Sequence, residues 1–232
     1  MKLNTNSNSY TIIYASVIVV IVAFALAFVS ASLSDTQKQN EDYDKMKQIL
    51  SALNIDASKA KDVQAEFDKY IKADEIINSK AEVLADKGGF KVDIKAELAE
   101  KLEDRQLPLY ICEVNGETKY ILPLYGAGLW NAIWGYIALN EDKNTVYGVY
   151  FDHAGETPGL GAEIATKLFQ DEFLNKHVMN NGKVELSVVK KGKVQKAEFE
   201  VDGISGGTIT SNGVDAMLKK CISQYDEFLK IK

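Results

Sequence analysis

Three glycine-rich segments carry the residue types that could bind a small anionic ligand. They span residues 125–131, 153–163 and 202–213. Each follows a predicted strand or precedes a predicted helix, where small residues let backbone N–H groups approach a ligand closely. Tight turns also need glycine, so any one segment could be purely structural. Three such segments in one chain, two of them rich in hydroxyl groups, favour a binding role.

The third segment is the most informative. A strand is predicted over residues 197–201 and a helix over residues 212–230, with the hydroxyl- and glycine-rich run 205–211 between them. The N-terminus of a helix offers unpaired N–H groups and a partial positive charge, which together favour a phosphate group. Ser211 or Asn212 could instead cap the helix, a role that needs no ligand.

Standard catalytic signatures are mostly absent. The sequence has no P-loop, no GxGxxG fingerprint and no HExxH zinc motif. Gly203 to Gly207 has the GxSxG spacing of a serine nucleophile, but that motif needs a later histidine, and both histidines precede Ser205. His153 and Glu156 share a loop, yet one histidine and one carboxylate form a common surface pairing. We therefore predict no catalytic residue and no metal site.

Composition and charge exclude several classes of protein. The 232 residues are 46% hydrophobic and 26% charged, as in an ordinary folded protein. The formal net charge of −6 disfavours a broad nucleic-acid-binding surface. Cys112 and Cys221 do not form a CxxC pair. We expect both to be buried free thiols, with a single disulfide as the alternative.

An uncharged apolar segment lies near the N-terminus. No charged residue occurs between Lys2 and Asp35, and residues 12–29 are apolar except for Ser16. A helix of this length spans about 27 Å, close to the hydrocarbon thickness of a bilayer. We predict one transmembrane helix over residues 10–33. A cleaved signal peptide is the alternative, although its apolar core is usually shorter.

The charges beside this segment predict its orientation. Lys2 and the terminal amine precede it without an acid, whereas the following flank mixes both signs. Since cytoplasmic flanks carry the excess of positive charge, we expect residues 1–9 in the cytoplasm and residues 34–232 outside it.

The rest of the sequence, residues 34–232, predicts a single α+β domain. Apolar residues at helical spacing between residues 35 and 73 predict two helices broken near residues 54–58. We place the other helices at 94–102, 162–175 and 212–230, and strands at 109–114, 118–122, 134–139, 145–151, 184–189 and 197–201. The last two strands would be joined by a solvated lysine-rich turn at 190–193. We expect a mixed or antiparallel sheet flanked by helices.

Residues 202–211, Asp-Gly-Ile-Ser-Gly-Gly-Thr-Ile-Thr-Ser, resemble the flavinylation motif of membrane redox complexes. In that family a Ser/Thr-Gly-Ala-Thr segment carries FMN through a phosphoester on its final threonine. Residues 156–163 and 126–130 resemble the family's other FMN-binding segments. The resemblance covers nearly the whole chain and is strongest to the C subunit of the sodium-translocating NADH:quinone reductases. One departure is visible, because Gly207 stands where the motif usually has alanine.

The resemblance implies that Thr208 carries covalent FMN, attached outside the cytoplasm by a dedicated flavin transferase. Trp130 and Leu160 would give apolar contacts and Thr157 a hydrogen bond, with core packing as the alternative for Trp130 and Leu160. The implied FMN-binding residues are Trp130, Glu156, Thr157, Leu160, Gly161, Ser205, Gly206, Gly207 and Thr210.

The resemblance also implies a function. The chain would carry electrons within a multi-subunit NADH:quinone reductase coupled to sodium export. It would cross the bacterial inner membrane once, with its C-terminal domain in the periplasm. Two alternatives stay open. One is the G subunit of the homologous ferredoxin:NAD-linked complex, and the other is a membrane-anchored module that binds an anion without a covalent bond.

Overall fold

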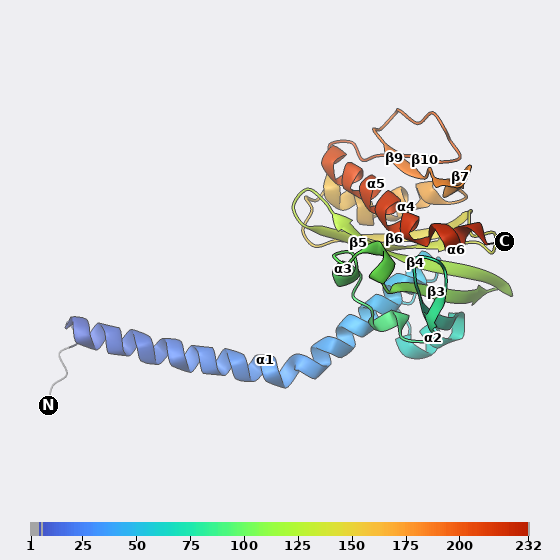
Figure 1. Ribbon diagram of the computed structural model, residues 1–232. Helices are drawn as coiled ribbons and strands as arrows, with labels where there is room; N and C mark the ends of the chain where they lie inside the picture. Colours follow the sequence, from blue (N-terminus) through green and yellow to red (C-terminus); the bar gives the residue numbers. More distant parts are fainter. Residues whose placement is uncertain (1–4, 6, 232) are drawn as a thin grey trace. The chain divides into compact units, whose positions relative to one another are not determined.

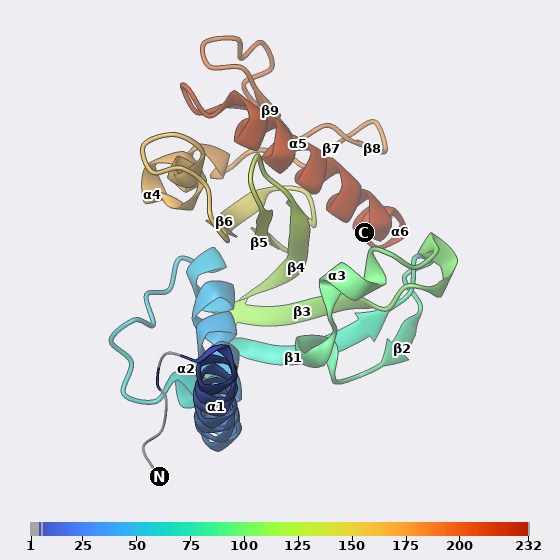
Figure 2. The same cartoon turned by 90° about the vertical axis from the view of Figure 1, so that its left-hand side faces the viewer.

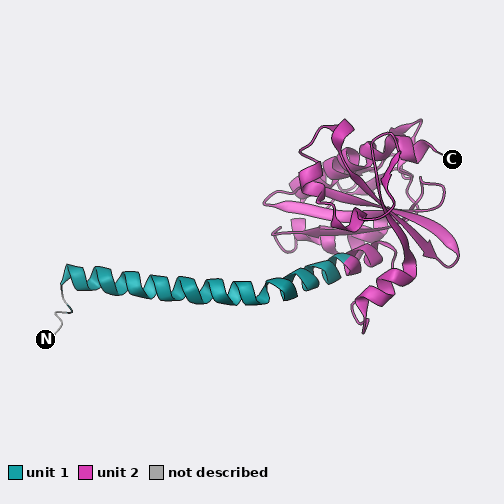
Figure 3. Ribbon diagram, turned by 60° about the horizontal axis from the view of Figure 1, so that its bottom comes forward, with its two compact units in different colours: residues 1–45 teal, residues 46–232 magenta. Residues whose placement is uncertain are grey.

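The computed structural model describes residue 5 and residues 7–231. Contacts divide the chain into two compact units, residues 1–45 and residues 46–232, which are coloured separately in Figure 3. The first unit consists mainly of helix α1 (Asn8–Ala52), which continues into the second unit. Between residues 12 and 33 its large apolar side chains are exposed. By length and composition, this helix could cross a membrane.

Helix α1 is longer than the sequence analysis predicted. The predicted span 10–33 lies within it, but the helix does not break there and runs on to Ala52. No glycine or proline occurs between residues 30 and 52, so nothing in this stretch interrupts the helical hydrogen bonds. The first of the two helices expected between residues 35 and 73 is therefore the end of α1.

The second unit is built on a six-stranded antiparallel sheet with the order β2-β1-β3-β4-β5-β6 (Figures 1 and 2). Its strands are β1 (Ile71–Ile77), β2 (Val83–Ala85), β3 (Leu107–Val114), β4 (Glu117–Ala127), β5 (Ala132–Leu139) and β6 (Val146–His153). Two small sheets pair β7 (Met179–Asn180) with β8 (Lys183–Val184) and β9 (Ser187–Val189) with β10 (Glu200–Asp202). This arrangement confirms the predicted α+β class.

The shorter helices complete the element list. They are α2 (Val63–Tyr70), α3 (Ile94–Glu97), α4 (Lys167–Gln170), α5 (Thr208–Ile222) and α6 (Asp226–Lys230), with 3-10 helices η1 (Gly89–Lys91), η2 (Leu102–Asp104), η3 (Gly161–Ala165), η4 (Asp171–Phe173) and η5 (Ser223–Tyr225).

Two hydrophobic clusters cover the two faces of the large sheet. Consecutive residues alternate between them, as expected of a strand buried on both faces: Ile121 belongs to one cluster and Leu122 to the other. Helix α5 supplies Met217 and Cys221 to the first cluster and lies along its face of the sheet (Figure 2). The last turns of α1 and helix α2 supply the second cluster.

The predicted hairpins are confirmed. β3 and β4 pair across Asn115 and Gly116, whose φ angles of 55° and 82° are those of the tight turn that Asn-Gly favours. β5 and β6 also pair as predicted. Cys112 and Cys221 are both free and buried, as expected, and burial raises the pKa of each thiol.

Several local predictions were wrong. The predicted helix at 162–175 is instead η3, α4 and η4 in succession, and the helix predicted at 94–102 is reduced to the single turn of α3, with η2 starting at Leu102. The second helix expected before residue 73 is α2, which ends at Tyr70 because Ile71 starts strand β1 beside β3. Strands β1 and β2 were not predicted from the sequence.

The lysine-rich segment after β9 is not a hairpin turn. β9 and β10 pair in parallel, with Val201 opposite Val188. Residues 190–199 therefore form a connection that carries the chain from the end of β9 back to the end of the small sheet at which β9 begins, which a tight turn cannot do.

Helix α5 begins four residues earlier than predicted. Its N-cap is Gly207, and Thr208 is its first residue. Ser211, one of the two residues considered as an alternative cap, lies inside the first turn, where its hydroxyl donates to the Gly207 carbonyl oxygen at 2.9 Å. The same hydroxyl oxygen accepts from the Ile204 N–H at 2.9 Å and so fixes the approach to the helix.

Candidate functional site

Thr208 lies on the surface at the start of α5. Its side chain is exposed, and among the described residues its hydroxyl has no hydrogen-bond partner. Two pockets meet at this residue, with volumes of ≈ 250 Å³ and ≈ 240 Å³. The threonine is therefore accessible from two sides.

The first pocket, which we call the Leu160 pocket, is lined by residues of all three glycine-rich segments. The other residues that line it are Leu129, Glu156, Thr157, Gly161, Gly206, Gly207, Thr208, Ile209 and Thr210. Most of the site residues predicted from the sequence thus come together here, although they lie about fifty residues apart in the chain. Trp130 and Ser205 do not line this pocket.

The second pocket, the Lys190 pocket, lies on the other side of Thr208. It is lined by Lys190 and Lys191 together with Ser205, Gly206 and residues at the start of α5. Sequence analysis assigned these lysines only to solvent. Their ammonium groups give a pocket beside Thr208 a positive charge, which favours an anion. Only the parallel pairing of β9 with β10 brings them there, and no local sequence signal indicates it.

A buried carboxylate connects the three glycine-rich segments. Glu156 is only 5% exposed. Its Oε2 accepts a hydrogen bond from Thr210 Oγ1 at 2.5 Å, and its Oε1 accepts from the Trp130 N–H at 2.9 Å. Burial by itself raises the pKa of Glu156, but these hydrogen bonds outweigh it and hold the pKa below its usual value.

His153 belongs to the same network. Its Nδ1 atom accepts a hydrogen bond from the Glu156 N–H at 3.2 Å, so the histidine supports the backbone of the loop. Among the described residues, no group of three or more His, Cys, Asp or Glu side chains could hold a metal ion.

Glycines allow the close approach of these loops. Gly206 has a φ of +78°, and a Cβ atom placed on it would lie 2.6 Å from Leu160 Cδ2. Gly207 has an ordinary negative φ of −104°, and its Cβ would meet Ile204 Cγ2 at 3.1 Å. Gly206 is therefore required mainly by its conformation, since the exposed Leu160 side chain can move aside, whereas an alanine at position 207 needs only a small shift of its neighbours.

Trp130 and Leu160 are not core residues. The side chain of Trp130 is 68% exposed and that of Leu160 is 43% exposed, so the core-packing alternative for these two residues is wrong. Leu129 and Ile209 are exposed as well. Leu129, Leu160 and Ile209 line the same pocket, and such a group of exposed apolar side chains indicates a binding surface.

These features fit an FMN group. A cationic pocket and a helix N-terminus suit its phosphate, and exposed apolar side chains suit its ring. Each pocket is smaller than an ordinary enclosed ligand site of about 300–1,000 Å³. The geometry therefore suits a flavin that is held in an open site and retained by more than contact alone.

The comparisons define the class of protein. The family model of the FMN-binding domain matches residues 128–223, which include Thr208 and the whole Leu160 pocket.

Curated relatives define the particular family. The C subunit of the Na(+)-translocating NADH-quinone reductase from Haemophilus ducreyi is 33% identical over 201 residues, which cover 79% of this chain and 77% of that protein. The same subunit from Vibrio vulnificus is 33% identical over 196 residues, covering 77% and 76%. The crystal structure of this subunit from Parabacteroides distasonis has a TM-score of 0.80 and 42% identity, covering 86% of this chain and 98% of that chain. The chain belongs to the family formed by the C subunits of Na(+)-translocating NADH-quinone reductases.

Proposed function

We propose that this chain is the FMN-carrying electron-transfer subunit of a sodium-translocating NADH:quinone reductase. FMN is bound covalently, through a phosphoester on the hydroxyl of Thr208. NADH oxidation, quinone reduction and sodium transport belong to other subunits, because this chain has no nicotinamide fingerprint and a single candidate membrane helix among its described residues.

The observation that supports Thr208 is the different state of the two nearby threonine hydroxyls. Thr208 is exposed between two pockets and its hydroxyl is unpaired among the described residues. Thr210 is buried, and its hydroxyl donates to Glu156. An enzyme that attaches a flavin can reach the first hydroxyl but would have to break a buried hydrogen bond to reach the second.

The surrounding residues have separate roles in holding the flavin. Lys190, Lys191 and the backbone N–H groups at the start of α5 compensate the phosphate charge. Leu160 and the exposed Trp130 give apolar contact to the ring system, and Thr157 offers a hydroxyl in the Leu160 pocket. When bound, FMN supplies a group that accepts and releases electrons one or two at a time.

Covalent attachment fits an open site. Electron carriers exchange electrons with neighbours, so part of the flavin must stay accessible. A bond to Thr208 keeps the flavin in place without an enclosing pocket, which would shield it from those neighbours.

We further propose that residues 10–33 are an uncleaved membrane anchor and that residues 34–232 lie in the periplasm. The apolar, exposed surface of α1 supports the anchor, and Lys2 supports a cytoplasmic N-terminus. A phosphatase fused after Lys232 should be active only if that end is exported. An active cytoplasmic reporter at the same position would refute the orientation, and a mature N-terminus near Ser32 would refute the anchor.

Of the two alternatives, the G subunit of the ferredoxin:NAD-linked complex is not favoured, because the relatives reported above are C subunits of the sodium-translocating enzyme. One experiment distinguishes covalent FMN from the second alternative, a module that binds an anion without a covalent bond. The chain is expressed with a flavin transferase and run on a denaturing gel. A fluorescent band that requires the transferase supports covalent FMN, and a dark band would refute it.

A further inference from the structure

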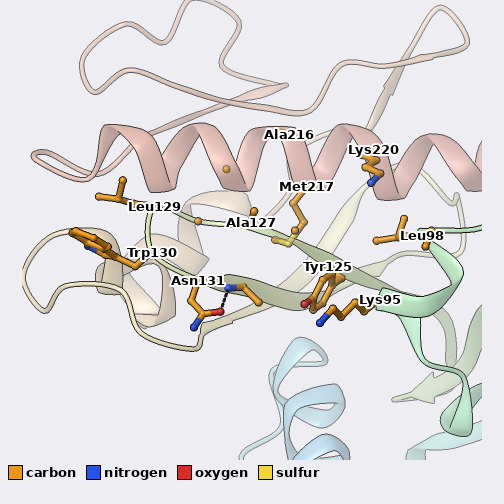
Figure 4. Close-up of a pocket in the computed structure, with 15 residues that line it drawn as sticks. Lys95, Leu98, Tyr125, Ala127, Leu129, Trp130, Asn131, Ala216, Met217 and Lys220 are labelled. Carbon is orange, nitrogen blue, oxygen red and sulfur yellow. Dashed lines mark hydrogen bonds between the residues drawn. The ribbon is translucent and has the colours of Figure 1, made fainter.

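A third and larger pocket lies beside the flavin site. Its volume is ≈ 730 Å³, and it is formed by helix α5, helix α3 and the turn between β4 and β5 (Figure 4). Met217 and Leu98 contribute apolar surface to it. Lys95 and Lys220 lie with Tyr125 at one end, and Trp130 lies at the other (Figure 4). The proposed flavin contact uses only Trp130 at one end of this pocket, and the rest of the pocket has no assigned occupant.

The charged end of this pocket is uncompensated. Lys95 and Lys220 are exposed, and among the described residues neither ammonium group has an ion-pair or hydrogen-bond partner. None of the described residues that line the pocket is acidic. This cationic end belongs to a chain whose formal net charge is −6, so the pocket differs in sign from the protein as a whole and favours an anionic group.

The pocket adjoins the proposed flavin site through one residue. Leu129 lines both this pocket and the Leu160 pocket. The neighbouring Trp130 is exposed, and aromatic side chains of this kind are frequent anchors in protein interfaces. An occupant of the pocket would therefore lie next to the group that carries the electrons.

We propose that this pocket docks an acidic segment of the neighbouring subunit with which the carried flavin exchanges electrons. Carboxylates of that segment pair with Lys95 and Lys220, and an apolar side chain packs on the accessible apolar surface that Leu98 and Leu129 contribute. The inference rests on the proposed function, because it assigns the pocket to the electron-transfer contact.

A protein segment fits the pocket better than a small molecule does. Most of the lining residues are exposed, including Ala99, Ala127 and Ala216, so the pocket is open along its length. An enclosed ligand site would bury most of its occupant. An open apolar surface with charges at one end is suited to the small, charge-steered interfaces of electron-transfer proteins.

Charge reversal in the assembled complex tests this docking site. The variant Lys95→Glu with Lys220→Glu is compared with Lys183→Glu with Lys193→Glu. The control pair is exposed and lines neither this pocket nor the two pockets beside Thr208. Both variants change the net charge equally. We expect the first to lower the rate of NADH:quinone reduction at least about tenfold at low salt and the second to leave it nearly unchanged. Equal rates in the two variants would overturn the proposal.

A zero-length carbodiimide crosslink identifies the occupant. In the wild-type complex, mass spectrometry should find Lys95 or Lys220 joined to an aspartate or glutamate of another subunit, and Lys183 should not be joined. Links only within this chain would overturn the proposal. Binding to anionic lipid vesicles provides a second test. If no such link is found, and the wild-type chain binds these vesicles but the Lys95→Glu, Lys220→Glu variant does not, the pocket faces a membrane and the proposal is overturned. Covalent flavin fluorescence is measured on the same samples, and its loss from the wild type would contradict the proposed function rather than the docking site.

Discussion

Thr210 Oγ1 donates a hydrogen bond of 2.5 Å to Oε2 of Glu156, and both side chains are buried. The other carboxylate oxygen accepts from the Trp130 N–H. One carboxylate thus joins the start of α5, the turn between β4 and β5, and the loop after β6. Because this pair uses the Thr210 hydroxyl, Thr208 is the one of these two threonines whose hydroxyl is free among the described residues.

Replacing Glu156 should loosen the whole site. Glu156→Ala leaves the Thr210 hydroxyl and the Trp130 N–H without their buried acceptor, so we expect the free energy of unfolding to fall by about 1–3 kcal/mol. Denaturant unfolding of the full chain in detergent measures this change. Glu156→Gln keeps one carbonyl oxygen as an acceptor, so its free energy of unfolding should fall less than that of Glu156→Ala. An Ala variant as stable as the wild type would show that the network does not hold the loops together.

The contribution of Glu156 should disappear in acid. Its folded-state pKa lies below the ordinary value of 4.5. At higher pH the ionised carboxylate therefore makes its full contribution to the free energy of unfolding. As the pH falls below about 4.5, the unfolded chain binds the proton first, and the contribution is lost as the pH passes through the folded-state pKa. The stability difference between wild type and Glu156→Gln should therefore be constant from about pH 7 to 5 and then shrink. A difference that grows on acidification contradicts the direction of the shift.

The two glycines before Thr208 should respond differently to alanine. Gly206→Ala places a Cβ at a φ of +78° and 2.6 Å from Leu160 Cδ2, so we expect a loss of about 1–3 kcal/mol and weaker flavin attachment. Gly207→Ala is the matched control, since its φ is ordinary and its contacts begin at 3.1 Å. It should retain attachment. Similar behaviour of both variants in unfolding and gel fluorescence would refute this account of the loop.

Local patterns were sufficient to predict the central hairpins. Asn115-Gly116 specifies a tight turn, and the short apolar runs rich in β-branched and aromatic residues along β3 to β6 specify the strands. The missed strand β1 follows α2 without a break, because pairing with β3 decides where the helix ends. The predicted helix at 162–175 has the right apolar residues, but the chain forms three short turns that place Phe169 and Phe173 against Phe151.

The site, like the fold, was predictable only where local sequence patterns mark it. Glycine and hydroxyl residues mark the loops, and the resemblance marks Thr208 among them. The burial of Thr210 against Glu156, and the position of Lys190 beside Thr208, depend on residues far apart in the chain. Spacing along the sequence contains no information about either contact, so only the folded structure reveals them.

The attachment point is tested most directly by the fluorescence and intact mass of denatured protein, made with a flavin transferase, for three variants. Thr208→Ala should lose the covalent flavin and remain folded, because the exposed side chain makes no hydrogen bond among the described residues. Thr210→Ala should be less stable by about 1–3 kcal/mol yet keep the flavin, and Thr210→Ser should keep both properties. If Thr208→Ala still carries the mass and fluorescence of FMN after denaturation, the flavin is bound elsewhere and the assignment of Thr208 is wrong.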